Sequence, residues 1–357
     1  MNSGPQRFDK YELRDLLGRN DSAEVWKAFD SQLNRYVVLK ILHANLQNDP
    51  EFVTRFQQQV QAIASLHHPN IVQIHDVRVL PVEPTSNSLT AFIVMQHVEG
   101  ASLASYISNT SRRGKFPPVG DIIHLFASIG SAIDYAHQHG VIHGGLRPDN
   151  ILLDRTNTMH SPIGEPVLID FGMNKLLGTS TMLLDGSSID TVVYVSPEQV
   201  LPFEPADLQG RSGSSVAGSH FKVRGQPASQ SSDIYALGVL LFEVCTGALP
   251  FQGNNPSAVM QQYINATPTS PSLINPNVPP ALATVILRSV AKDPAARFPS
   301  ASSMVAVLAQ ALNMPVPSLP IPKAGTSTAS TDPMDEPTYV IPCLLYTSPS
   351  PRDRQNL

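Results

Sequence analysis

Two stretches of the sequence constrain the fold most. Residues 141–154, VIHGGLRPDNILLD, lead from the end of an apolar helix pattern through a turn into a short apolar strand. Residues 167–172, VLIDFG, form a second apolar strand pattern, which ends in Asp-Phe-Gly. Short apolar runs bounded by turn residues are typical of buried strands. The sequence therefore predicts two short buried strands, one preceded by a polar turn and one followed by a turn.

Together these stretches resemble the catalytic loop and the metal-binding loop of protein kinases, whose usual text is H-R-D-L-x-x-x-N followed by D-F-G. The pattern is kept at His143, Leu146, Asn150, Asp170, Phe171 and Gly172. It is broken at Gly145, where the family has its catalytic Asp, and at Gly144, where it has Arg. The resemblance therefore implies a kinase fold without its catalytic base and without the arginine that reads an activation-loop phosphate.

The resemblance is to bacterial, eukaryotic-like Ser/Thr protein kinases, and it covers about residues 8–312. It implies an α+β, bilobal protein kinase fold. A small β-rich N-lobe would span about residues 8–97, and a larger helical C-lobe about residues 98–312. A Gly/Ser-rich insertion at about residues 201–231 is expected to be flexible, because loops longer than about 15 residues are typically functional or disordered.

Three further residues match those that hold the large lobe together in this family. Residues 232–251 match its central helix, in which Asp233 corresponds to the residue that holds the catalytic-loop backbone. Arg297 corresponds to the partner of Glu198, which lies in SPEQ, a variant of the family's A-P-E. Retention of these three residues favours a chain that keeps the fold.

By the same resemblance, a nucleotide site is expected between the lobes. Its residues would be Gly18, Val25, Val38, Lys40, Met95, Gln96, Val98 and Leu152, and its metal ligands Asn150 and Asp170. Lys40 matches the lysine that holds the α- and β-phosphates. The backbone of residues 96–98 would offer hydrogen bonds to the adenine ring, with Met95 behind it. The implied cofactors are ATP and Mg²⁺.

The loop expected over the phosphates departs from the family pattern. Of its three glycines only Gly18 is kept, since Asn20 and Ala23 replace the others. Glycine matters there because backbone N–H groups must approach phosphate oxygens without a Cβ in the way. Asn20 is the more disruptive change, although Asn tolerates left-handed conformations better than most residues.

Two more departures affect the pocket itself. Val38 replaces the family's alanine, and its two extra methyl groups narrow the space for adenine. Gln59 lies in an amphipathic helix pattern at residues 50–66 and replaces the Glu that normally pairs with the strand lysine. A glutamine can accept one neutral hydrogen bond from Lys40 but cannot form the charge-assisted pair.

Composition limits the classes of partner and compartment. The net charge of −5 gives no reason to expect nucleic acid or an anionic membrane as partner. The two cysteines, Cys245 and Cys343, are far apart and suit a reducing compartment better than a disulfide scaffold. No apolar run reaches the roughly 18 residues of a membrane span. We therefore expect a cytoplasmic location and no membrane span within this chain.

Both ends of the chain are expected to lie outside the folded domain. Residues 1–7 read as a disordered lead-in, and residues 313–342, rich in Pro, Ser and Thr, as a flexible linker. Residues 343–357 resemble translated adapter text and are expected to be a non-native tail, so the natural C-terminus would be missing. Bacterial relatives often continue through such a linker into a membrane span, which would tether the complete protein to a membrane.

One threonine of the linker resembles a recognition site. Thr338 follows acidic residues and precedes Ile341 by three positions, a pattern similar to the phosphothreonine sites read by forkhead-associated domains. A plain linker threonine is the alternative. We expect protein partners, either other kinases or phosphothreonine-reading domains.

Three functions are compatible with these motifs. The first is a pseudokinase that signals by binding, with ATP–Mg²⁺ as a ligand. The second is a weakly active, ATP-dependent Ser/Thr protein kinase, because loss of a general base typically costs about 10²–10⁴-fold in rate. The third is a scaffold that does not bind nucleotide. The retained Asn150 and Asp170 favour nucleotide binding, whereas Val38 and Asn20 oppose it.

Overall fold

A computed structural model describes most of the chain up to residue 317. The described residues are 7–19, 23–42, 50–81, 89–158, 161–172, 193–200, 226–252 and 256–317. The chain divides into two units, Met1–Pro322 and Lys323–Leu357. The predicted non-native tail, Thr338 and nearly all of the predicted linker lie outside the described residues, so the account below concerns the first unit.

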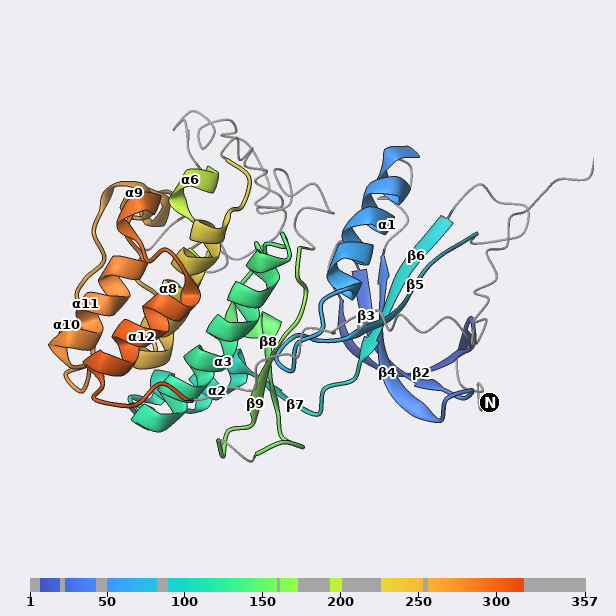
Figure 1. The fold of residues 1–357 in the computed structure, drawn as a ribbon, viewed down its shortest axis with the longest axis horizontal. Helices are drawn as coiled ribbons and strands as arrows, with labels where there is room; N and C mark the ends of the chain where they lie inside the picture. The colour runs from blue at the N-terminus through green and yellow to red at the C-terminus, as the bar shows by residue number, and fades with distance from the viewer. Residues whose placement is uncertain are drawn as a thin grey trace, which may run out of the picture. The chain divides into compact units, whose positions relative to one another are not determined.

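The N-terminal part is a six-stranded antiparallel sheet with strand order β1-β2-β3-β4-β6-β5 (Figure 1). Its strands are β1 (Arg7–Phe8), β2 (Tyr11–Arg19), β3 (Ala23–Asp30), β4 (Arg35–Leu42), β5 (Ile74–Pro81) and β6 (Leu89–Gln96). Helix α1 (Pro50–Ala64) packs beside β5 and buries Phe56 and Val60. The sheet and helix make up the predicted N-lobe.

The strand register explains which side chains share a face of this sheet. Val25 is paired with Gly18 on one side and with Lys40 on the other, and Val38 is paired with Met95. Paired residues point to the same face, and faces alternate along each strand. All five of these residues therefore lie on one face of the sheet.

A second, three-stranded sheet contains the two strands predicted from the sequence. Its order is β7 (Gly100–Ser102), β8 (Ile151–Asp154) and β9 (Glu165–Leu168), all antiparallel. Backbone hydrogen bonds tie this sheet to the loop after α1, because Val72 N–H donates to Leu168 and Leu168 N–H donates to Asn70, at 2.9 and 2.8 Å. The metal-binding loop follows β9 directly.

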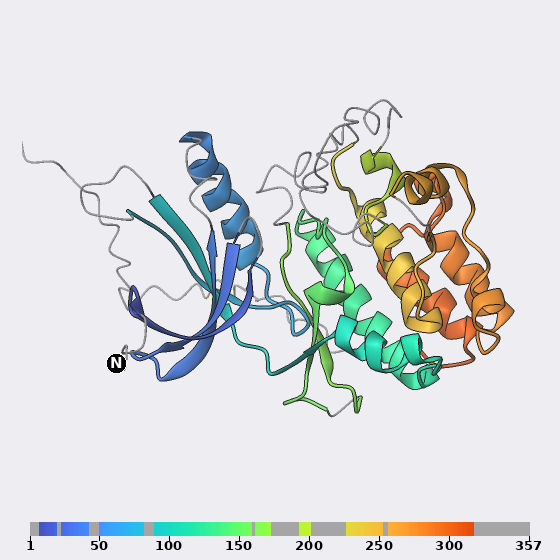
Figure 2. The ribbon, with the colours of Figure 1, turned by 180° about the vertical axis from the view of Figure 1, so that it is seen from behind.

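The C-terminal part is helical, as Figures 1 and 2 show from opposite sides. Its α-helices are α2 (Leu103–Asn109), α3 (Val119–Gln138), α6 (Pro197–Val200), α8 (Gln230–Thr246), α9 (Pro256–Asn265), α10 (Pro271–Ile274), α11 (Pro280–Ser289) and α12 (Ala301–Ala311). Short 3-10 helices are η2 (Ser111–Arg113), η3 (Pro148–Asn150) and η5 (Pro294–Ala296). The α+β, two-part architecture predicted from the sequence is confirmed.

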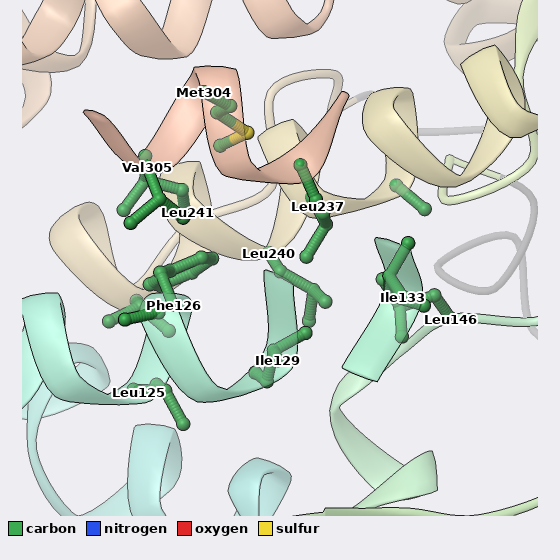
Figure 3. Packing of buried hydrophobic residues seen from close by; sticks show 14 of the residues in the cluster. Leu125, Phe126, Ile129, Ile133, Leu146, Leu237, Leu240, Leu241, Met304 and Val305 are labelled. Atoms are coloured by element: carbon green, nitrogen blue, oxygen red, sulfur yellow. The ribbon is translucent and has the colours of Figure 1, made fainter. Parts of the chain in front are cut away.

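The large core lies where α3, α8 and α12 pack together (Figure 3). Helix α8 is buried along almost its whole length, which is typical of a central helix that is apolar on all sides. Leu146 of the catalytic loop belongs to the same cluster as Ile133 of α3 and Leu237 of α8. The catalytic loop is therefore anchored to the core through the side chain of Leu146.

Two predicted boundaries need correction. Arg7, assigned to the disordered lead-in, lies in β1 because it pairs with Glu12 of β2, and their side chains form an ion pair at 3.1 Å. Helix α8 begins at Gln230, inside the predicted 201–231 insertion, because Ser229 and Ser232 form a capping box. Residues 201–225 of that insertion lie outside the described part. None of the helices among the described residues is both long and apolar enough to cross a membrane.

Candidate nucleotide site and catalytic loop

The lysine predicted to hold phosphates meets the predicted metal ligand directly. Lys40 Nζ donates to Asp170 Oδ1 at 2.7 Å, and the two side chains are 8% and 27% exposed. Strand β4 positions Lys40, and Asp170 stands two residues beyond the end of β9. Asp170 has a φ of 63°, a left-handed conformation that is uncommon for residues other than glycine. The fold therefore brings the two predicted polar residues into one charge-assisted pair.

Gln59 of α1 lies against the metal-binding loop. A Cβ atom added to Gly172 would come within 2.6 Å of Gln59 Nε2, and Gly172 has a φ of 61°. Glycine is therefore favoured there by its backbone conformation, whereas the Gln59 amide stands at the end of a flexible side chain that can move away from an added Cβ. In the described part of the chain, the hydrogen bond made by Lys40 Nζ goes to Asp170 and not to Gln59.

Asp233 of α8 holds the backbone of the catalytic loop by hydrogen bonds. Its carboxylate accepts from the N–H groups of His143 and Gly144, both at 2.9 Å, and lies 2.8 Å from Nε2 of His137. Asp233 is 1% exposed. Buried hydrogen bonds to a charged group are among the stronger ones. The role predicted for Asp233 is confirmed by these contacts.

His143 joins the catalytic loop to the metal-binding loop. Its ring packs against Phe171 at a tilt of 39°, with centroids 4.4 Å apart, and its backbone carbonyl accepts from the N–H of Gly172 at 3.0 Å. Complete burial lowers the pKa of His143, so the ring is neutral. Its Nδ1 accepts from the N–H of Gly145 at 3.3 Å. The histidine of the motif is thus a structural link between the two loops.

The two glycines of the broken motif differ in their surroundings. Gly144 has a φ of 66°, and a Cβ there would lie 3.3 Å from Cβ of Ala228. Any larger residue at position 144 would be strained in its backbone and tightly packed. Gly145 presents no side chain, and its carbonyl accepts from Asn150 Nδ2 at 2.7 Å. The loop therefore keeps its shape while position 145 supplies no carboxylate.

The donor atoms of the two predicted metal ligands are of the kind that a hard divalent cation prefers. The side-chain nitrogen of Asn150 donates to the carbonyl of Gly145. The backbone carbonyl of Asn150 accepts from the N–H of Ile169, the residue before Asp170. The amide oxygen of Asn150 and the second carboxylate oxygen of Asp170 are the remaining ligand atoms. Carboxylate and amide oxygens suit Mg²⁺, which usually takes one or two such ligands together with substrate phosphates and water. Among the described residues, no group of three or more His, Cys, Asp and Glu side chains could hold a metal by itself.

The residues predicted to surround adenine gather in one apolar cluster. Met95 and Val98 are buried members of it, and Val38 and Leu152 pack against it. Val38 comes from β4 of the N-terminal sheet and Leu152 from β8, so the two reach the cluster from different sheets. The N–H of Gln96 donates to the carbonyl of Gln73 at 2.9 Å. A ligand ring could therefore use the carbonyl of Gln96 but not its N–H.

A cavity that sequence reasoning missed lies behind Lys40. It is small and partly open to solvent. Its walls are Lys40, Ile63, Ile71, Val72, Ile74, Ile93, Met95, Asp170 and Phe171. No local sequence signal predicts it, because its walls come from α1, three strands and two loops.

Arg147 is a residue of the catalytic loop that the sequence analysis did not single out. Its Nη2 lies 3.4 Å from Asp149 Oδ2, and its Nε is buried without a hydrogen-bond partner in the described part of the chain. A buried donor without a partner is costly. The signal was present, since Arg147 is the single cation between His143 and Asn150.

The predicted pairing of Glu198 with Arg297 is confirmed. Arg297 Nη1 and Nη2 donate to the two carboxylate oxygens of Glu198 at 2.8 and 2.7 Å. Burial alone would raise the pKa of Glu198, but the hydrogen bonds and charge of Arg297 hold it below its usual value. This bidentate pair fixes α6, which follows the predicted activation segment, to the loop before α12.

Parts of the predicted site lie outside the described residues. They are the turn at residues 20–22, which includes Asn20, and residues 173–192, which are most of the stretch between Gly172 and Ser196 that resembles a kinase activation segment.

Comparison with known proteins adds an independent line of evidence. The family described as "Protein kinase domain" matches residues 11–310. Serine/threonine-protein kinase PknB of Mycobacterium leprae is 33% identical over 309 residues, which are 86% of this chain and 44% of that protein. Serine/threonine-protein kinase PrkC of Bacillus subtilis is 33% identical over 303 residues, which are 85% of this chain and 40% of that protein. The chain thus spans less than half the length of these curated relatives.

A solved structure shows the same fold. The crystal structure of the Mycobacterium tuberculosis PknI kinase domain is similar with a TM-score of 0.60 and 22% sequence identity. The similarity covers 87% of this chain and 100% of that chain.

Proposed function

Because the chain belongs to the protein kinase family, we propose that it is a pseudokinase. In this proposal it keeps the kinase fold, binds a nucleotide between its lobes and acts on protein partners. It transfers phosphate slowly or not at all. The observation that carries the proposal is Gly145, which stands where the family has its catalytic Asp.

Phosphoryl transfer requires positioned phosphates, a metal ion and an oriented nucleophile. The first two requirements have candidates here in Lys40, Asp170 and Asn150. The third does not, and removal of a general base typically costs about 10²–10⁴-fold in rate. Asp149 is the nearest acid in the loop sequence, but its carboxylate lies 3.4 Å from Arg147 and would have to leave that pair to serve as a base.

We propose ATP and Mg²⁺ as ligands of this site. The sheet face that carries Gly18, Val25 and Lys40 supports this, because these positions line the nucleotide in the resemblance described above. Asp170 and Asn150 would hold the metal. When bound, Mg²⁺ would neutralise charge on the phosphates. The chain's own contribution is to orient the phosphates through Lys40 and to enclose the ring between Val38 and Leu152.

Partners and location belong to the same proposal. The binding function would be directed at proteins, either other kinases or phosphothreonine-reading domains. A cytoplasmic location is supported by the free, buried thiol of Cys245.

A weakly active Ser/Thr kinase is the second candidate. The 2.7 Å pair between Lys40 and Asp170 and the orientation of Asn150 favour it, because positioning and metal binding alone can retain part of the catalysis.

The test is radiolabelled phosphate transfer from ATP by the full chain, with Mg²⁺ and with Mn²⁺, to a generic acceptor protein. The control is the Lys40→Ala variant, and circular dichroism checks that it is folded. The pseudokinase proposal expects no incorporation above this control. Incorporation that disappears in the Lys40→Ala variant would establish the weak kinase instead.

A further inference from the structure

We infer that the face at the C-terminal end of α8 is a docking surface for an acidic, leucine-containing segment of a partner protein. This α8-end surface is formed by η2 and the turn after it, residues 111–115, and by α10 (Pro271–Ile274). The inference rests on the proposed function in one respect, that the chain acts by binding proteins, and it names the chemistry of such a partner. The surface shares no residue with the nucleotide cleft, so the two can be tested separately.

Two neighbouring carbonyls in the last turn of α8 hold both parts of this surface. Ser111 Oγ donates to the carbonyl of Val244 at 2.5 Å, and Asn275 Nδ2 donates to the carbonyl of Cys245 at 2.8 Å. Successive carbonyls of a helix lie only a few ångströms apart, so η2 and the end of α10 are anchored within roughly 10 Å of each other. The exposed residues next to Ser111 and Asn275 therefore lie close enough for one ligand segment to reach both.

The η2 side of the surface is cationic, because Arg112, Arg113 and Lys115 are all exposed. Arg112 pairs at 2.8 Å with the carboxylate of Glu243, which is 2% exposed and also accepts from the hydroxyl of Tyr194. Arg113 and Lys115 extend beyond this buried pair.

No other acid lies in the elements that adjoin the surface. Residues 100–120, which include α2 and η2, contain no Asp or Glu. Residues 244–287, which include the end of α8, all of α10 and most of α11 (Pro280–Ser289), contain no charged residue at all. The α8-end surface is therefore positive, although the whole chain carries a net charge of −5.

The α10 side of the surface is apolar. Leu273 is 79% exposed and its neighbour Ile274 is 39% exposed. The turn that carries them is fixed, because Pro271 and Val278 are buried and Ser272 Oγ donates to the carbonyl of Val278 at 2.9 Å. Two adjacent large apolar side chains on a fixed turn are thus available for contact with a partner.

The cationic turn is equally well fixed. The N–H of Gly114 donates to the carbonyl of Ser111 at 3.0 Å, and the N–H of Lys115 donates to the carbonyl of Thr110 at 3.2 Å. The carbonyl of Ser111 approaches Gly247, the C-cap of α8, so closely that no Cβ atom would fit there. A backbone that is already ordered lowers the entropy cost of binding.

An acidic segment that contains leucines matches both halves of this surface. Its carboxylates would pair with Arg113 and Lys115, and its leucines would cover Leu273 and Ile274. An anionic membrane matches the surface less well, because basic clusters that bind lipid usually contain about four to eight cations. The net charge of −5 also repels an anionic bilayer. The chemistry therefore favours a protein segment.

The test is fluorescence anisotropy of a labelled synthetic helical peptide titrated with the full chain. The peptide carries leucines on one face and glutamates on the other, and a second peptide has lysines in place of the glutamates. The charge-reversal variant is Arg113→Glu with Lys115→Glu, and the apolar variant is Leu273→Ser.

Matched controls make the same changes at exposed positions of the N-terminal part. They are Arg14→Glu with Arg35→Glu, both in the six-stranded sheet, and Leu33→Ser in the turn between β3 and β4. Circular dichroism checks that every variant is folded.

The inference expects the wild type to bind the glutamate peptide saturably and not the lysine peptide. The charge-reversal variant should bind about tenfold more weakly or worse, because repulsion replaces attraction at two positions. Leu273→Ser should weaken binding by about fivefold or more, because it removes apolar area from the contact. The controls should stay within about twofold of the wild type, since salt screens distant charges.

Absence of saturable binding by the wild type, or equal losses in the variants and their matched controls, would overturn the inference. Cosedimentation of the wild type with phosphatidylserine vesicles that is lost in the charge-reversal variant would also overturn it, because the surface would then serve a membrane. Each of these results leaves the phosphate-transfer test of the proposed function unaffected. Phosphate transfer by the wild type would refute the pseudokinase without changing the result for the α8-end surface.

Discussion

Replacing Arg297 by alanine should lower the free energy of unfolding more than the replacement of an exposed arginine does. The Arg297 side chain is 0% exposed, and it donates to both oxygens of Glu198. It also donates to the carbonyls of Ala291, Ser231 and Lys292, at 2.8, 3.0 and 3.1 Å. Removing one partner of a buried ion pair leaves an uncompensated charge and typically costs about 3–5 kcal/mol. We expect a loss of this size in the free energy of unfolding.

Urea unfolding followed by far-ultraviolet circular dichroism measures this loss. The matched control is Arg113→Ala, which removes an exposed arginine and should change stability by less than about 0.5 kcal/mol. The double variant Arg297→Met with Glu198→Gln should recover part of the loss, because it leaves no charge unpaired. A loss below about 1 kcal/mol in Arg297→Ala would refute the reasoning, since the pair would then contribute no more than a surface salt bridge.

Three further predictions concern the cleft and its surroundings. Val38→Ala should tighten binding of a fluorescent ATP analogue severalfold by removing two methyl groups from the pocket, and unchanged or weaker binding would contradict the expected narrowing. Gly172→Ala should lower the free energy of unfolding by about 1–3 kcal/mol, because its φ is 61°. Gly140→Ala, whose φ is 72°, should cost a similar amount, and an unchanged stability in both variants would contradict the backbone argument. Burial lowers the pKa of His68 to about 4, so between pH 6.5 and pH 4 the unfolded chain binds a proton that the folded chain does not, and stability should fall as the pH falls through this range. Urea unfolding at several pH values should show a weaker dependence in His68→Gln than in the wild type, whereas the same change at exposed His67 should leave it unaltered.

The sequence predicted the parts of the fold that recur as ordered motifs. The two short strands, the central helix and the residues Asp233, Glu198 and Arg297 lie where the motif spacing places them. These features could be predicted because each motif fixes a loop between two elements that the apolar core then holds. Leu146 shows this directly, since it anchors the catalytic loop in the same cluster as α3 and α8.

The choice of side-chain partners could not be predicted in the same way. Gln59 was expected to face Lys40, yet its amide lies against Gly172, and Lys40 pairs with Asp170. Such choices depend on how closely α1 approaches the metal-binding loop, which no residue spacing along the chain specifies. The cavity behind Lys40 was missed for the same reason, since several separate elements form its walls.

Element ends were missed where local hydrogen bonds decide them. Helix α8 begins at Gln230 because the side chains of Ser229 and Ser232 cap it. A Gly/Ser-rich composition indicated only a long flexible segment there. Arg7 belongs to the sheet because the two-residue strand β1 pairs with β2, with Arg7 opposite Glu12.

The central claim is that the missing carboxylate at position 145 stops phosphate transfer. Its most direct test compares radiolabelled transfer by the wild type, Gly145→Asp and Gly145→Asn, all as the full chain with Mg²⁺. Asp and Asn have similar size, so only the carboxylate distinguishes the two variants. The account predicts that the wild type and Gly145→Asn show no transfer above the Lys40→Ala background, and that Gly145→Asp exceeds this background by about 10²-fold or more. Transfer by the wild type above its Lys40→Ala control, or no difference between the Asp and Asn variants, would contradict it.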